Sequence, residues 1–427
     1  LLLHDENLRS TLLQVMVSAR REGASMLATV RPLESQWLVS QGMRRYTLGP
    51  YEQQERAQAV NSLVAVFCPT GHPEAVAAID AAEARGLPVA EVASNPLTLR
   101  LWFEGSAPHF PSVEADVTTI YRRYWAVKVA DDVRITGGPS RASQDESLIA
   151  ATTARVMMAL GTPEPTEEAA LTYVRAETVD SDLSLETLKS RGVLAVAGRN
   201  IRFFHQTLFE FAAARALFSD VSQTLATALL DRVLNRPDDL FLGSVLEQYI
   251  VIAADDQLRA DWCAAAIRRL VESHHAPLQS IAVAAWAHHP GLRVSPDLLK
   301  SVSRWASSRF CKIAPSVTTL HTMRILELLR VLYDRREPRF DHDIIPALTR
   351  LLRRDPNLTS TELRRWPLFT DIFTSGRDDR RAREEALTLL STLAHAAPDL
   401  AVQATRTVLV WANMYSKRRK ITCALLE

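Results

Sequence analysis

The first amphipathic pattern in the chain covers residues 7–22, where apolar residues lie three or four positions apart at Leu8, Leu12, Val15 and Ala19. This period predicts a helix with one buried face, and Gly23 ends it. A short apolar run over 24–30 follows and favours a buried strand before Arg31 and Pro32. A helix, a glycine and a buried strand form half of a βαβ unit, so we expect part of a parallel sheet, with its first strand at 1–4 or upstream.

Helical patterns then continue to about residue 134. They predict helices over 52–66, 73–86, 94–105 and 113–132. The third helix starts with Ser94 and Asn95, which can cap it, and carries Pro96 in its first turn, where proline is tolerated. The last has one apolar face, formed by Val113, Val117, Ile120, Tyr121, Tyr124 and Val127. We expect residues 51–134 to form a small helical domain.

Residues 135–144 are rich in glycine and polar residues, which is typical of a linker. Helices are expected after it at about 145–160 and 166–175, and a third over 184–190 stops near Gly192. Two short strands, VLAVA and IRFFH, then flank the turn at 198–200. A helix followed by a β-hairpin is the ending of a winged helix, so residues 145–217 are expected to form such a domain.

From residue 218 to 427 the patterns are helical, and short loops with proline, aspartate or asparagine separate them. Residues 319–333 carry an apolar stripe of Leu320, Met323, Leu326 and Leu329, with Ile325, Leu328 and Leu332 beside it. Segments 343–354 and 383–398 show a similar amphipathic helical pattern. The pattern predicts a HEAT-like α-solenoid of irregular period. The expected fold class is therefore mostly α with a small α/β remnant.

The charge balance and the cysteine content argue against several classes of function. Lys and Arg number 50 against 49 Asp and Glu, so the charge of +1 exerts no overall attraction toward nucleic acid or a membrane. The four cysteines lie far apart and form no CxxC pair, which argues against a disulfide framework or zinc ribbon and favours the cytoplasm. We find neither a bilayer-spanning apolar run nor a signal peptide. Because the chain starts with Leu1, we expect a fragment of a longer protein.

The sequence contains neither a G-x-x-x-x-G-K-[ST] phosphate loop nor a GxGxxG motif. Asp5 and Glu6 follow an apolar run, and a nucleotide hydrolase uses such a pair to hold Mg²⁺ through water and to orient the attacking water. The same pattern also describes an acidic helix start. Arg31 follows the expected strand, at the edge where ligands bind in open α/β sheets, although a surface arginine before a proline has this pattern too.

His205 stands behind two phenylalanines at the start of an alanine-rich run, and by itself it fits a hydrogen-bonded core histidine. The pairs at 274–275 and 288–289 suggest metal ligands, but adjacent histidines point apart on a helix and no carboxylate or cysteine stands at ligand spacing. We therefore expect no metal site. The basic run 414–421 is compatible with phosphate binding and with a solvated helix face. Lys189 and Arg191 near the hairpin give only a thin positive surface, which argues against DNA reading by the winged helix.

Five segments occur in a characteristic order: ATVRP (28–32), TLGPYEQQERAQAV (47–60), VASNPLTLRLW (92–102), IYRRYW (120–125) and LETLKSRGVL…IRFFHQTLFEFAAARAL (185–217). Over about residues 1–217, this order resembles the C-terminal half of the nucleotide-binding module in STAND-type NTPases of the NACHT kind. The resemblance implies that residues 1–50 end an AAA+-like P-loop core. A helical domain, a winged helix and repeats then follow.

The resemblance also implies a site for ATP or ADP with Mg²⁺. Arg31 matches the sensor arginine that reads the γ-phosphate, and Pro96 matches the proline that packs against the base. His205 matches the winged-helix histidine that approaches the β-phosphate in the closed, ADP-bound state. Asp5 and Glu6 match the Walker B acids only in part, because a helix starts directly after them where the family has a longer acidic loop. The true Walker B can therefore lie upstream with Walker A.

These implications favour a nucleotide-dependent signalling or defence switch. Nucleotide exchange would release the winged helix, slow hydrolysis would reset it, and the helical repeats would sense a ligand or protein partner. Assembly into a homo-oligomer would accompany activation. Two alternatives stay open: a STAND-type transcription regulator, and a helical-repeat scaffold with a non-functional NTPase core.

Overall fold

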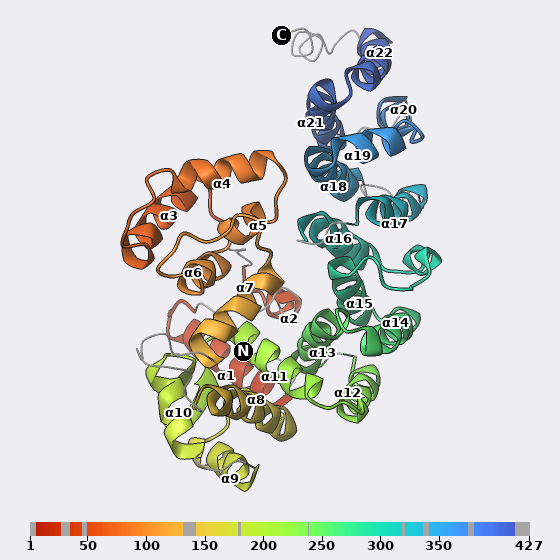
Figure 1. Cartoon of the computed structure of the whole chain (residues 1–427). Coiled ribbons are helices and arrows are strands. Elements are labelled where there is room, and N and C mark those ends of the chain that lie inside the picture. Colours follow the sequence, from red (N-terminus) through yellow and green to blue (C-terminus); the bar gives the residue numbers. More distant parts are fainter. Residues whose placement is uncertain are drawn as a thin grey trace. The chain divides into compact units, whose positions relative to one another are not determined.

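The computed structural model describes residues 6–26, 35–44, 49–130, 142–177, 181–237, 239–317, 321–335, 341–374 and 380–414. This described part is mostly helical, with 22 α-helices and one two-stranded sheet (Figure 1). The expected mostly α class is thus confirmed. The chain divides into two compact units, residues 1–50 with 238–240, and residues 51–237 with 241–427.

The first unit contains α1 (Glu6–Arg21) and α2 (Ser35–Ser40). Leu12 and Met16 of α1 pack with Leu38 of α2 in a small buried cluster. Val15 is 50% exposed, so its expected place on the buried stripe is wrong. The reason is geometric, because in this cluster α1 buries residues four apart, Leu12 and Met16, and Val15 falls beside that narrow line.

Only residues 24–26 of the expected strand at 24–30 are described, and they have no regular structure. The remainder of that strand and the proposed strand at 1–4 lie outside the described residues. Gly23 has a φ of +68°, a left-handed conformation that ends α1 as expected.

The helices of residues 51–130 are α3 (Gln53–Phe67), α4 (Ala75–Ala84), α5 (Val89–Ser94), α6 (Pro96–Glu104), α7 (Val117–Tyr124) and a π-helix (Trp125–Ala130). The expected helix at 94–105 starts two residues later, because Asn95 is extended (φ −106°, ψ 124°) and caps α6. The expected helix at 113–132 starts at α7, capped by Asp116, and its end is π-helical. Ile120, Tyr121 and Tyr124 are buried, as their spacing predicts.

Residues 142–218 form α8 (Ala142–Leu160), α9 (Glu167–Glu177), α10 (Ser181–Ser190), β1 (Leu194–Ala197), β2 (Asn200–Phe203) and α11 (Gln206–Phe218). The two strands are antiparallel, with Leu194 opposite Phe203, so the expected hairpin is confirmed. An isolated antiparallel bridge joins Thr166 to Asn200 at the hairpin tip. Helix α8 packs against α9, α10 and α11. Of the expected linker at 135–144, residues 135–141 lie outside the described residues and 142–144 begin α8.

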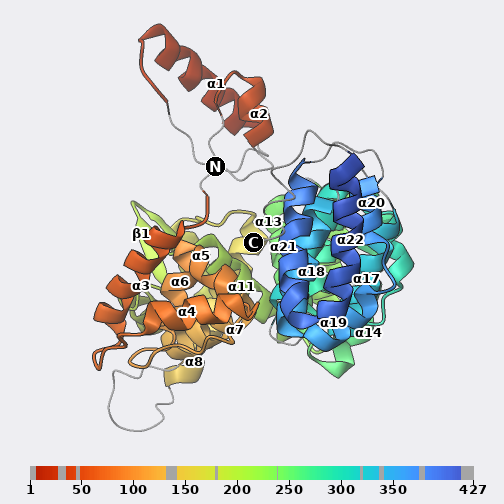
Figure 2. The same ribbon diagram turned by 90° about the horizontal axis from the view of Figure 1, so that it is seen from above.

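The remaining α-helices are α12 (Thr224–Asn235), α13 (Leu240–Ala253), α14 (Gln257–Glu272), α15 (Ala276–His288), α16 (Arg304–Ile313), α17 (Thr322–Asp334), α18 (Asp341–Arg354), α19 (Pro356–Leu363), α20 (Leu368–Thr374), α21 (Arg380–Ala396) and α22 (Pro398–Met414). Two 3₁₀ helices, Pro296–Lys300 and Ala314–Ser316, stand among them. Helices α15, α16, α18 and α21 pack one on the next, and α14, α17, α19 and α22 pack against members of this row (Figures 1 and 2).

The apolar stripe expected over 319–333 is confirmed at Leu326 and Leu329, which are buried in α17. Met323 is 49% exposed, so its place on the stripe is wrong. The buried face of α17 runs through residues such as Ile325 and Leu332, and Met323 lies at the edge of that face in the first turn. Leu320 lies outside the described residues.

Candidate functional site

His205 occupies the junction between the hairpin and α11. Its extended backbone (φ −142°, ψ 142°) follows β2, and its Nδ1 accepts a hydrogen bond of 3.1 Å from the backbone N–H of Thr207. The imidazole therefore acts as the N-cap of α11, a position that asparagine or aspartate fills more often. Because Nδ1 accepts, the neutral ring carries its proton on Nε2. The partly buried ring is thus both a structural cap and a hydrogen-bond donor.

A row of rings connects His205 to helix α7. The Phe204 ring lies 6.3 Å from the His205 ring and 5.9 Å from the ring of Tyr124, centroid to centroid. Burial raises the pKa of Tyr124, the Glu104 carboxylate raises it further, and Arg100 lowers it. Tyr124 therefore lies within electrostatic reach of two charged residues on α6.

Pro96 begins the same helix. It is exposed at the first position of α6, and Asn95 Oδ1 accepts hydrogen bonds from the N–H of Leu97 (2.9 Å) and Thr98 (3.4 Å). Pro96, Arg100 and Glu104 are four residues apart, so they share one face of α6, and an ion pair of 3.1 Å joins the last two. Pro96 therefore begins a helix that packs on α7, and α7 in turn contacts the residues before α11 through Tyr124 and Phe204.

Helix α11 is fastened by its apolar side chains. The Phe211 ring lies 6.0 Å from Tyr121 and 5.7 Å from Trp125. Phe203, Phe209 and Phe211 are buried and Phe204 is partly so, while Ala212, Ala213 and Ala214 are buried without residual exposure. The alanines permit the close packing of α11 on α8.

Glu210 is an acidic residue within the buried part of α11. It is 7% exposed on α11. Burial raises the pKa of Tyr121 to about 12, the Thr207 side chain lowers it, and the Glu210 carboxylate raises it. The acidic group lies near side chains that join α7 to α11, because all seven residues from Leu208 to Ala214 are buried.

The other site residues of the sequence prediction belong to the first unit. Asp5 and Arg31 lie outside the described residues, and Glu6 is the first residue of α1. Residues 415–421 of the basic run also lie outside them. Pro96 and His205 both belong to the second unit, and the structure describes neither Asp5 nor Arg31.

The second histidine pair, His288 and His289, makes contacts within the fold. His289 Nε2 lies 2.8 Å from the carbonyl oxygen of Val251, and its Nδ1 lies 3.3 Å from a carboxylate oxygen of Asp255. Burial lowers the pKa of His288 to about 4. Both residues, with His321, line a cavity of about 670 Å³. In the part of the chain that the structure describes, no group of three or more His, Cys, Asp or Glu is arranged to hold a metal ion.

The cations beside the hairpin are paired with acids. Lys189 Nζ bonds Glu167 and lies 2.7 Å from Glu186. Arg191 donates to the carbonyl oxygen of Val129 at 3.1 Å and lies 3.5 Å from Glu146. These contacts reduce the positive charge available to a phosphate backbone.

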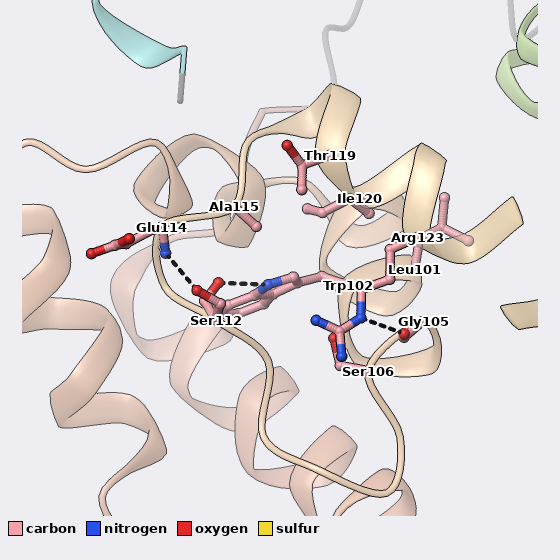
Figure 3. Close-up of a pocket in the computed structure, with 10 residues that line it drawn as sticks. All are labelled: Leu101, Trp102, Gly105, Ser106, Ser112, Glu114, Ala115, Thr119, Ile120 and Arg123. Atoms are coloured by element: carbon pink, nitrogen blue, oxygen red, sulfur yellow. Dashed lines mark hydrogen bonds between the residues drawn. The ribbon is translucent and has the colours of Figure 1, made fainter. Parts of the chain in front are cut away.

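Helices α6 and α7 enclose a small cavity of about 180 Å³ with the loop that joins them (Figure 3). The Trp102 indole N–H donates to the carbonyl oxygen of Ser112 at 3.2 Å, and Arg123 Nε donates to that of Gly105 at 2.9 Å. These bonds hold the loop against both helices. The cavity is a consequence of this packing and is too small for a nucleotide.

No known protein-family model and no curated protein matches this chain. Among the described helices, none has the length and apolar content to cross a lipid bilayer.

Proposed function

We propose that this chain forms the C-terminal part of an ATP/ADP-dependent signalling or defence switch of the STAND type, NACHT kind. The observation that carries the proposal is the position of His205, an imidazole donor placed at the start of α11 directly behind a helix–hairpin unit. Residues 51–134 then form the small helical domain, residues 145–217 the winged helix and residues 218–427 a HEAT-like solenoid.

The order of elements before His205 supports the winged-helix assignment. Helix α8 is followed by the bridge residue Thr166, then by α9, α10 and the β1–β2 hairpin. A winged helix has this order, with a short strand after its first helix paired to the hairpin. The Thr166 bridge to Asn200 supplies that strand in its shortest form.

The geometry of His205 supports contact with a phosphate. The neutral ring carries its proton on Nε2 because Nδ1 accepts from Thr207. An Nε2–H group is a suitable donor to a β-phosphate oxygen. The ring also stands at the positive end of the α11 dipole, which favours a negatively charged ligand. Loss of the phosphate contact would weaken the binding of this winged helix to the nucleotide.

The packing of α11 supports transmission of the change. Phe211 lies against Tyr121 and Trp125, and the Arg215 guanidinium lies 5.3 Å from the Trp125 ring centroid. A displacement at His205 would therefore strain the contact between the winged helix and the helical domain. This contact would then have two states, one with ADP bound and one with ATP bound, and nucleotide exchange would convert one into the other. The repeats would sense a ligand or partner, and a homo-oligomer would form on activation.

The nucleotide site itself would be completed by Arg31, by Pro96 and by a phosphate loop, a motif that these 427 residues do not contain. Mg²⁺ would be held by Walker B acids, either Asp5 and Glu6 or a pair upstream. Slow hydrolysis would reset the switch. We place the protein in the cytoplasm, and the buried free thiols of Cys68, Cys263 and Cys311 agree with a reducing compartment.

The test compares three forms of the natural protein, including any residues encoded before Leu1: wild type, His205→Asp and His205→Ala. Aspartate keeps a side-chain cap but removes the donor and repels phosphate, whereas alanine removes both. We expect co-purified ADP, measured by chromatography after denaturation, to fall in both variants while His205→Asp keeps wild-type stability. Asp256→Ala, which removes the cap of α14 (Asp256 accepts from Leu258 N–H at 2.9 Å), controls for destabilisation alone.

Equal ADP occupancy in wild type and His205→Asp would contradict the proposal. Absence of ADP from the wild-type protein would favour the helical-repeat scaffold instead. The pairing of Lys189 and Arg191 with carboxylates weighs against DNA binding by this winged helix, so a transcription regulator would need a separate DNA-binding domain.

A further inference from the structure

A third cavity lies between the helical domain and the helical repeats. Its volume is about 640 Å³, within the range of small-molecule sites. One wall comes from the start of α3 and the segment from α4 to α5, with Tyr51 and Ser94 among its residues. The other comes from the end of α16 and from α18. All of these elements belong to the second unit.

The cavity is lined by more cations than acids. Its charged residues are Arg56, Lys312, Arg350, Arg353, Glu83 and Glu91. Four positive and two negative side chains leave a formal charge of +2 on the lining. This differs from the chain as a whole, which carries only +1 over 427 residues.

Two of these cations already have carboxylate neighbours. Arg56, with 10% of its side chain exposed, lies 2.8 Å from Asp80 and 2.7 Å from Glu83, so it is neutralised within the helical domain. Arg350 lies 3.9 Å from Glu91, the limit of an ion pair. Its guanidinium is instead oriented by Ser316 Oγ at 2.8 Å and the carbonyl oxygen of Lys312 at 3.3 Å.

The excess charge belongs to Lys312 and Arg353. Both side chains are exposed, and neither makes a hydrogen bond or an ion pair within the part of the chain described here. With Arg350, they place three cations on one wall. On the other wall, Glu83 is paired with Arg56, and Glu91 lies near Arg350. Three cations facing one cavity attract an anion of more than one charge.

A glycine sets how closely the two walls approach. Gly86 has a φ of +69°, and a Cβ at this position would stand 2.7 Å from the backbone oxygen of Arg350 and 3.3 Å from Cβ of Arg353. Any other residue would push α18 away. The separation of the walls, and therefore the width of the cavity, depends on this backbone contact.

We propose that this cavity binds a small phosphorylated metabolite that carries at least two negative charges. Arg350 and Arg353 donate to phosphate oxygens through their guanidinium groups, and Lys312 contributes a point charge. The hydroxyl groups of Tyr51 and Ser94 offer polar contacts to the remainder of the ligand on the opposite wall. Because the ligand contacts both the helical domain and the repeats, it joins them. The inference does not rest on the proposed nucleotide switch.

The test is calorimetric titration of the full chain with pyrophosphate, alongside inorganic phosphate, tripolyphosphate and citrate. We expect pyrophosphate and tripolyphosphate to bind, and phosphate to bind more weakly. The double variant Lys312→Gln/Arg353→Gln should weaken pyrophosphate binding at least about tenfold, because it removes two charge-assisted contacts to phosphate oxygens. Arg268→Gln, on the exposed surface of α14, is the matched control and should bind as wild type does.

Gly86→Ala gives an independent measurement, because it changes no charge. It should weaken binding by shifting α18, whereas His205→Asp should leave binding unchanged. Equal binding by the double variant and the Arg268→Gln control would overturn the inference, as would citrate binding as tight as pyrophosphate binding. If His205→Asp abolishes binding and the double variant does not, the probe reports the nucleotide site, and this inference fails while the proposed switch stands.

Discussion

The imidazole of His205 caps α11 by accepting the N–H of Thr207 at 3.1 Å, so one side chain ends the hairpin and starts the helix. A residue proposed to contact a nucleotide is therefore also part of the fold. A replacement that keeps the cap but removes the Nε2–H donor separates the functional effect of a substitution from its structural effect.

His205→Ala is expected to destabilise the chain by about 1 kcal/mol, because the start of α11 loses its side-chain cap. His205→Asn and His205→Asp should recover most of this loss, since both residues cap well. Urea denaturation followed by circular dichroism measures the differences. An alanine variant as stable as wild type would show that Nδ1 does not act as the cap.

Gly243→Ala should destabilise the chain by about 1–3 kcal/mol through overpacking. A Cβ on this residue of α13 would stand 2.6 Å from Cδ1 of Ile281 on α15. Ile281→Val removes that methyl group, so the double variant should be more stable than the sum of the two single effects predicts. Denaturation of the four proteins of this cycle measures the coupling, and strict additivity would exclude the contact.

The stability of the second unit should fall as the pH drops from about 6.5 toward 4. Burial lowers the pKa of His288 to about 4, the Asp116 carboxylate opposes this shift, and His289 and Arg309 add to it. Between these pH values the unfolded chain binds the proton and the folded chain does not, so stability rises with pH there. The lost stability is about 3 kcal/mol at most.

His288→Gln cannot bind that proton and should show a flatter pH dependence of its unfolding midpoint than wild type. Its control is His395→Gln, which replaces an exposed histidine on α21. The same slope in wild type and His288→Gln would show that other groups cause the pH dependence.

Arg309→Met should cost about 2–4 kcal/mol, more than the loss of an exposed ion pair. Arg309 joins α16 to Glu247 on α13 at 2.7 Å and to Ser280 Oγ on α15 at 3.2 Å, and only 12% of the Glu247 side chain is exposed. The matched control is Arg269→Met, whose pair with Asp231 is about half exposed at both partners (48% and 51%) and contributes about 0–1 kcal/mol. Chemical denaturation of both variants compares the two, and equal losses would contradict the burial argument.

Local patterns predicted the elements well where a stop signal or cap marked their ends. Gly23 ended α1, and the turn at 198–200 located the hairpin to within one residue. Met323 and Val15 were placed incorrectly, because an apolar residue beside a helical stripe has the same sequence signal as one on it. Which of the two is buried depends on the width of the neighbouring surface.

For the candidate site, the sequence indicated Pro96 and His205 as residues of interest, but it did not indicate which elements pack between their helices. The row of rings from Tyr124 through Phe204 to His205, which connects α7 to the start of α11, has no signal in the sequence. The cavity between the helical domain and the repeats was not indicated by the sequence. Its walls come from residues 51–94 and 312–353, and nothing in the sequence order links these two stretches.

The sequence by itself determined the mostly helical class and the position of the hairpin, since these depend on neighbouring residues along the chain. Only the tertiary structure decided that His205 caps α11, that Glu210 is buried, and that Lys312, Arg350 and Arg353 face Glu91 across one cavity. Burial and charge pairing depend on elements that are distant in sequence and adjacent in space, and the local period of a helix carries no information about which element will cover it.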